Sequence, residues 1–280
     1  MTGLLKADFR RVFKDKLIIV MAIIAAVFAV ITPALYVVIL LASGGAFDTA
    51  GMPMQMFGDI FSAKTQFFSS FSMGNNFGLI APVFLAIVLC KDFSYGTIRN
   101  KIIAGKSRSA IFMSLFTTCS VVFSGIMFLH SFLTLGISLI FFDYQYVPFT
   151  FDDFLYFVES LVLELLILIF ISALLSYLCA NMKNVGLAIV LYIAVSFGLV
   201  TVGSIVQVAQ SVLLPMDVSE TVISAVEFFD KINVGTASSR IGMGTSYSLE
   251  DILYNAVPPI IGIIGFVGLG LIKFNKKDLK

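Results

Sequence analysis

The sequence predicts an all-α polytopic membrane protein with six transmembrane helices. Of its 280 residues, 59% are hydrophobic and only 12% are charged, whereas soluble globular domains are about half apolar and a quarter charged. A water-soluble chain of this length could not bury so many apolar side chains. The apolar residues also fall into six long stretches. Lipid cannot satisfy exposed backbone groups, so these stretches are expected to be helical.

Each stretch has roughly the 20 residues that a helix needs to cross about 30 Å of hydrocarbon. The connection between the fourth and fifth spans, residues 181–184, is so short that these two helices must be antiparallel neighbours. No segment remains for a soluble domain, so residues 1–280 are predicted to form a single transmembrane domain. The expected spans are about 17–42, 73–90, 109–142, 154–180, 185–209 and 252–272.

Basic residues predict the orientation. If the N-terminus is cytoplasmic, all of the 18 basic residues except Lys64, Lys231 and Arg240 belong to cytoplasmic segments. Lys and Arg concentrate in the cytoplasmic loops of membrane proteins. Both termini are therefore predicted to be cytoplasmic.

Residues 1–16 are predicted to form an interfacial helix before the first span. Leu5, Phe9, Val12 and Phe13 recur at helical spacing, and cations occupy the remaining faces. Such a helix would lie on the inner leaflet, with its cations near anionic headgroups. The alternative is a solvated basic tail that only sets the topology.

The loop 91–108 is predicted to contain a short helix. Thr97 is expected to cap a helix over residues 98–104, and Gly105 suits the position after its end. A short capped helix between two spans can move as a rigid lever, dock on a soluble partner and pass motion into both spans. The alternative is an ordinary basic loop. Three isoleucines are expected to share one face of this helix: Ile98, Ile102 and Ile103.

Several kinds of chemistry are excluded. Gly105-Lys106-Ser107 resembles the end of a phosphate-binding loop, but Asn100 stands where that pattern needs a glycine, so this chain is not expected to bind ATP. The single histidine excludes a His-Glu-x-x-His zinc site. No cofactor or metal is expected on this chain. It is not predicted to be an enzyme, and no basic tract with interleaved aromatics suggests nucleic acid as a partner.

Two outward segments are not simple spans. Residues 210–251 are amphipathic and too charged to cross the membrane; exofacial helices are expected here, with Ser219 as a cap and Gly235 as a stop. A mobile surface loop is the alternative. Residues 43–72, which include Met52, Met54 and Met56, are expected to pack as a loop against the membrane.

Three ionisable residues, His130, Glu159 and Glu164, fall inside the expected spans. Charge at membrane depth is costly and usually faces protein or water. At about 1.5 Å per residue, His130 and Glu164 lie at similar depths on consecutive helices, which predicts a hydrogen bond between them. This pair would be either a polar point on a translocation path or a structural contact between helices. Glu159 lies nearer the outer surface and can extend to it.

The loop after the second span reads Lys91-Asp92-Phe93-Ser94-Tyr95-Gly96-Thr97-Ile98-Arg99-Asn100-Lys101, and Gly105-Lys106-Ser107-Arg108 leads into the third span. This loop resembles that of the ABC-2-type permeases of Gram-positive ABC exporters. In that family an acidic residue precedes a Gly-Thr pair, a coupling helix follows, and a Ser-Arg step opens the third span. The resemblance covers the whole chain in outline. Two departures are Asp92, where many members carry Glu, and Gly105-Lys106, where many carry proline.

The resemblance implies a permease subunit in a bacterial cell membrane, surrounded by lipid and paired with separate cytoplasmic ATPase subunits that bind ATP and magnesium. A second permease subunit, identical or related, would complete the path. The cargo would be antimicrobial or amphipathic peptides or antibiotics, in resistance, immunity or secretion. The residues implied to dock in the ATPase are Thr97, Ile98, Arg99, Asn100 and Lys101.

Another class of function stays open. A proton-coupled secondary transporter could use Glu164 and His130 without any ATPase. The sequence shows no inverted repeat with paired broken helices, which such transporters commonly have.

Overall fold

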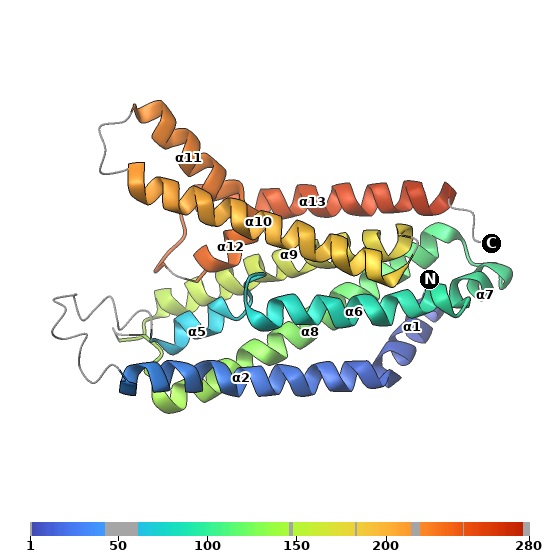
Figure 1. Cartoon of the computed structure of the whole chain (residues 1–280), viewed down its shortest axis with the longest axis horizontal. Coiled ribbons are helices and arrows are strands. Elements are labelled where there is room, and N and C mark those ends of the chain that lie inside the picture. Colours follow the sequence, from blue (N-terminus) through green and yellow to red (C-terminus); the bar gives the residue numbers. More distant parts are fainter. Residues whose placement is uncertain are drawn as a thin grey trace.

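The computed structural model describes residues 2–42, 61–145, 148–182, 184–213, 219–242 and 244–276, and these residues form helices and no strands. Of the expected loop 43–72, the part with Met52, Met54 and Met56 lies outside the described residues, whereas residues 63–69 form a helix, so the loop prediction was wrong there. In chain order (Figure 1) the helices are α1 (Thr2–Lys14), α2 (Lys16–Ala42), α5 (Ala63–Ser69), α6 (Asn76–Ser94), α7 (Thr97–Ile103), α8 (Arg108–Phe141), α9 (Phe151–Asn181), α10 (Val185–Leu213), α11 (Glu220–Ile232), α12 (Val234–Arg240) and α13 (Leu249–Lys276).

Five of these helices, α2, α8, α9, α10 and α13, are long and apolar enough to cross a membrane. The chain is therefore a helical multi-pass membrane protein, which confirms the predicted class at that level. The number of candidate crossings rises to six if α6 and α7, which meet at an angle of 47°, are treated as one broken span. The expected span ends differ from those of the corresponding helices by no more than four residues.

Helices α8 and α9 form the centre of the bundle, because a larger share of their residues is buried than in α2, α10 and α13. The helices α2, α10 and α13 lie at the periphery and expose large apolar side chains such as Ile23, Val190 and Ile264. A soluble protein does not expose so much apolar surface along whole helices. In a membrane these side chains face lipid.

Local sequence explains where the central helices begin. The Ser107 hydroxyl accepts a hydrogen bond from the backbone N–H of Ala110, so it caps α8 just before Arg108. At the start of α9, Thr150 and Asp153 cap each other's backbone N–H groups in a capping box. Helix α9 ends at Asn181 and α10 begins at Val185, as the short predicted connection requires.

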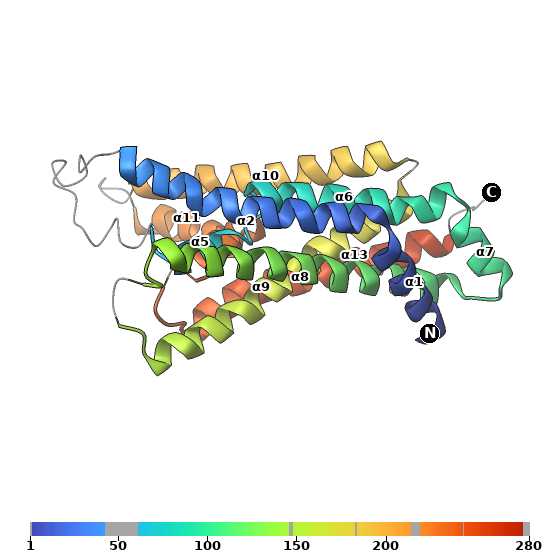
Figure 2. The same cartoon turned by 90° about the horizontal axis from the view of Figure 1, so that it is seen from below.

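The two ends of the bundle differ. Both ends of the described chain lie at one end, together with α1 and α7, whereas α5, α11 and α12 lie toward the other (Figures 1 and 2). Helix α11 has no buried residue. By contrast, residues 234–238 of α12 are all buried, so this short helix enters the bundle. The prediction of exofacial helices was right about helix formation but did not foresee that one of them would be buried.

Gly235 has a packing role. It was expected to stop a helix, but this was wrong, because α11 ends at Ile232 and Gly235 lies inside α12. Asn233 separates the two helices, and its side chain accepts a hydrogen bond from the Gly235 N–H at 2.7 Å. A Cβ atom on Gly235 would lie 2.6 Å from the backbone carbon of Leu199. Glycine therefore lets α12 pack directly on the backbone of α10.

Candidate functional site

The candidate site is α7, at the end of the bundle that carries both ends of the described chain. Gly96 allows the sharp bend before it, with a φ of 68° that glycine adopts without strain. Thr97 was expected to cap the helix, but this was wrong: Gly96 holds the capping position, and no side chain caps this end. Gly105, with a φ of 77°, follows the helix as predicted.

One face of α7 is anchored in the bundle. The Ile98 side chain is 2% exposed and belongs to the hydrophobic core. Lys101 lies three residues further on, hence on the same face, and its side chain is 13% exposed. Its ammonium nitrogen lies 2.6 Å from a carboxylate oxygen of Asp8 in α1 and 3.6 Å from one of Asp92 in α6.

Lys101 belongs to a cluster of four charges, Asp8, Arg11, Asp92 and Lys101, which we call the α1–α7 ion cluster. Arg11 of α1 pairs with Asp92, whose side chain is 1% exposed. The Ser114 hydroxyl of α8 donates a 2.6 Å hydrogen bond to Asp8. The two positive and two negative charges balance, as buried charges require. The cluster therefore ties α7 to α1, α6 and α8.

A second ion pair, closer to the surface, links α6 to the chain between α1 and α2. The Lys91 ammonium lies 2.7 Å from a carboxylate oxygen of Asp15, which stands between α1 and α2. Burial acts to raise the pKa of Asp15, but hydrogen bonds from Lys91 and the Leu17 N–H lower the pKa below its ordinary value. This pair fixes the turn between α1 and α2 to the end of α6.

The other face of α7 is exposed. Tyr95 is 77% exposed and Ile103 is 76% exposed, and Arg99 and Asn100 are exposed as well. The expectation that Ile103 shares a face with Ile98 was therefore wrong, because Ile98 is buried and Ile103, at the last turn of α7, is exposed. We call Tyr95, Arg99, Asn100 and Ile103 the exposed face of α7.

The five residues predicted for coupling thus divide by position. Arg99 and Asn100 are available to a partner, and Thr97 is partly exposed. Ile98 and Lys101 face the bundle instead. Sequence reasoning could not separate Lys101 from Arg99, because the acidic partners of Lys101 come from α1 and α6.

The N-terminal helix contributes a polar group that the sequence prediction missed. The side chains that α1 buries are Leu4, Asp8 and Val12, one helical turn apart. The predicted apolar face was partly wrong, since Phe13 is exposed and Phe9 is only partly buried. An acid between Leu4 and Val12 was the signal available in the sequence, because a buried carboxylate requires a partner.

His130 and Glu164 are both buried but do not form the predicted hydrogen bond. His130 Nδ1 lies 2.9 Å from the carbonyl oxygen of Ala25 in α2. Glu164 accepts a 2.9 Å hydrogen bond from Ser238 of α12, and its other oxygen has no hydrogen-bond partner among the described residues. The prediction failed because α2 and the inserted α12 supply nearer partners. Glu159 is exposed on α9.

The described part of the chain contains no group of three or more His, Cys, Asp or Glu side chains that could hold a metal ion. Comparisons with protein-family models, with curated proteins and with solved structures gave no match to this chain.

Proposed function

We propose that this chain is the membrane-spanning permease subunit of an ATP-driven exporter in a bacterial cell membrane, with both termini in the cytoplasm. ATP and magnesium would be bound by separate ATPase subunits, and a second permease subunit would complete the transport path. The observation that carries the proposal is the two-sided construction of α7. One face is fixed to the bundle by buried charges, and the other presents Tyr95, Arg99 and Ile103 outward.

This construction suits the transmission of force. A surface helix without a mechanical role would not require a balanced ion cluster beneath it. Because Lys101 pairs with Asp8 and Asp92, a displacement of α7 would move α1 and the end of α6 with it. Ser114 extends the connection to α8, one of the two central helices. An ATPase that pressed on α7 would therefore act on the centre of the bundle.

Six crossings fit this proposal. Both ends of the described chain lie at the same end of the bundle (Figure 1), which requires an even number of crossings. We take α6 as the sixth crossing beside the five apolar helices, with α7 following it outside the membrane. Most of the basic residues belong to segments at the α7 end, so this end is proposed to be cytoplasmic. Export of antimicrobial or amphipathic peptides or antibiotics is proposed as the activity.

The test uses co-purification and ATPase measurements. The permease is expected to co-purify in mild detergent with an ATPase, whose hydrolysis rate rises when the permease is present. Arg99→Glu should abolish this stimulation, because it reverses a charge on the exposed face of α7. Lys106→Glu makes the same charge change in the same loop, beyond α7, and serves as the control.

Two results would contradict the proposal. Full stimulation by Arg99→Glu would exclude the docking role of α7. Labelling of Arg99→Cys by a membrane-impermeant maleimide applied outside intact cells would place α7 on the wrong side of the membrane. The three native cysteines are buried, so labelling reports on the introduced residue.

A further inference from the structure

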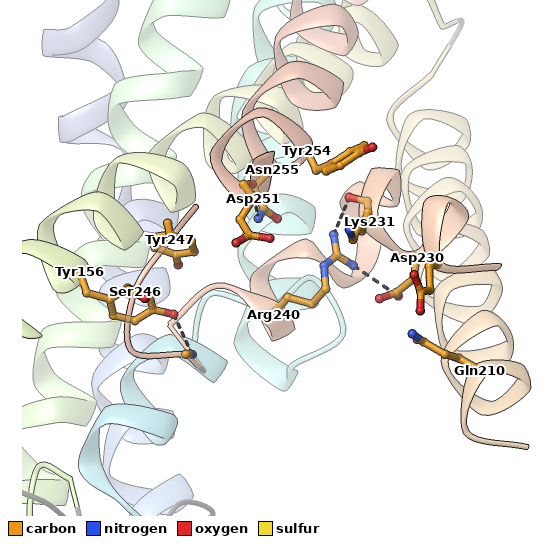
Figure 3. A pocket seen from close by; sticks show the side chains of 12 residues that line it. Tyr156, Gln210, Asp230, Lys231, Arg240, Ser246, Tyr247, Asp251, Tyr254 and Asn255 are labelled. Atoms are coloured by element: carbon orange, nitrogen blue, oxygen red, sulfur yellow. Dashed lines mark hydrogen bonds and ion pairs between the residues drawn. The ribbon is translucent and has the colours of Figure 1, made fainter. Parts of the chain in front are cut away.

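A polar cavity of about 430 Å³ lies at the end of the bundle opposite α7. It is bounded by α11, α12, the start of α13 and the loop before it (Figure 3). Two tyrosine rings, Tyr156 and Tyr247, stack with centroids 4.5 Å apart at one side. The Tyr156 hydroxyl accepts a 2.8 Å hydrogen bond from the Gly244 N–H, which fixes the loop. The cavity is therefore built from ordered contacts.

The charges around this cavity favour a positively charged ligand. Three carboxylates line it, those of Glu227, Asp230 and Asp251. Of the two lining cations, Lys231 pairs at 3.3 Å with Glu250, which is not part of the lining. The other, Arg240, donates hydrogen bonds to two backbone carbonyls, and its contact with Asp230 is long at 3.5 Å (Figure 3). The lining thus retains excess negative charge.

Asn255 supplies an independent indication of a ligand. Its side chain lines the cavity and is 8% exposed. The amide nitrogen donates a 2.9 Å hydrogen bond to the Asp251 carbonyl. The other polar atom of the side chain is the acceptor Oδ1. This oxygen has no hydrogen-bond partner among the described residues. A buried acceptor without a partner costs free energy, so a ligand that donates hydrogen bonds would be stabilised there.

An apolar groove adjoins the polar cavity. It has a volume of about 690 Å³ and lies between α11 and α13, lined by side chains such as Phe228, Leu253, Val257 and Ile261. Tyr254 lines both the groove and the cavity. A ligand near Tyr254 would therefore have the negatively charged, hydrogen-bonding cavity on one side and the apolar groove on the other.

We propose that the cavity and the groove together bind a cationic amphiphile, a peptide segment with lysine or arginine beside large apolar side chains. The cationic group would lie among Glu227, Asp251 and Asn255 Oδ1, and the apolar part would lie in the groove. This inference deepens the proposed export function, on which it rests, by assigning the chemical class of the cargo and its site at the outer end.

The test measures binding by the permease alone. The chain contains no tryptophan, so Phe228→Trp places a single fluorescent reporter in the groove. The protein is held in nanodiscs of zwitterionic lipid, because anionic lipid would itself attract cations. The probe is an amphipathic peptide of leucine and lysine, and the matched probe carries glutamine at every lysine position.

The lysine peptide is expected to give a saturable change in emission, and the glutamine peptide a much weaker one. In the reporter background, Glu227→Gln should raise the Kd about fivefold, the size expected for one partly exposed ion pair. Asn255→Leu should raise it by a similar factor. Glu220→Gln, the same change on the same helix but outside the cavity lining, should leave the Kd unchanged.

Equal binding of the two peptides would overturn the proposal, because it would show that the peptides bind through their apolar side chains alone. So would an unchanged Kd in Glu227→Gln. A raised Kd in this variant would not be explained by misfolding, because Glu227 lies on α11, a helix without buried residues. The measurement needs no ATPase. A failure of peptide binding therefore leaves the coupling test at α7 intact, and a failure of coupling leaves the binding result interpretable.

Discussion

Replacement of Lys101 by methionine tests the foundation of the proposed mechanism. The variant keeps an unbranched side chain, one atom shorter than that of lysine, and removes its charge. The Asp8 and Asp92 carboxylates, whose side chains are 6% and 1% exposed, would then have only Arg11 to balance them. One buried negative charge would remain without compensation.

The magnitude follows from the distances. At separations of 2.6 and 3.6 Å, an effective dielectric constant of about 20 gives gross attractions of about 6 and about 5 kcal/mol. Desolvation of the lysine offsets a large part of this sum. Loss of one partner from a buried ion pair typically costs about 3–5 kcal/mol, and we expect Lys101→Met to lower the free energy of unfolding by that amount.

The assay is reversible unfolding in mixed detergent micelles with increasing SDS, followed by circular dichroism. Arg99→Met is the matched control, because Arg99 lies on the exposed face of the same helix, and its effect should stay within about 0.5 kcal/mol. Asp8→Asn combined with Lys101→Met restores charge balance and should recover part of the loss. Equal stability of Lys101→Met and the unmodified protein would refute the ion cluster and the transmission of force built on it.

Three further predictions concern other contacts. Gly235→Ala should destabilise the protein by about 1–3 kcal/mol, because its methyl group would meet the backbone of α10; Gly265→Ala, with open space around it, should change the free energy of unfolding little in the same SDS titration. Ser238→Ala should cost about 1–3 kcal/mol, because it removes the hydrogen-bond donor to the buried Glu164; an unfolding midpoint equal to that of the unmodified protein would contradict this contact. Because folding lowers the pKa of Asp15 below its ordinary 3.8, its ion pair should stabilise the fold fully above that pH and less as the pH falls through the lowered pKa. Unfolding measured between pH 6 and 3 should then show a weaker acid dependence in Asp15→Asn, and identical pH profiles would argue against the pair.

The sequence by itself determined the class of the molecule and the limits of its long helices. Apolar stretches act over neighbouring residues, so their consequences are visible in a single stretch of chain. It also located α7, because Gly105 marks the end of a short helix-forming run, although the start of the helix was assigned to Thr97 rather than to Gly96. These features can be predicted without knowing which helices pack against each other.

Only the tertiary structure decided which polar groups meet. Lys101 and Arg99 look alike in the sequence, yet one is held by Asp8, 93 residues away, and the other is exposed. Glu164 pairs with Ser238, 74 residues away, rather than with His130. The partner of a buried charge depends on how helices distant in sequence pack, and several packings satisfy the same apolar pattern. Periodicity therefore identifies a buried face, but only the packed bundle identifies the partner.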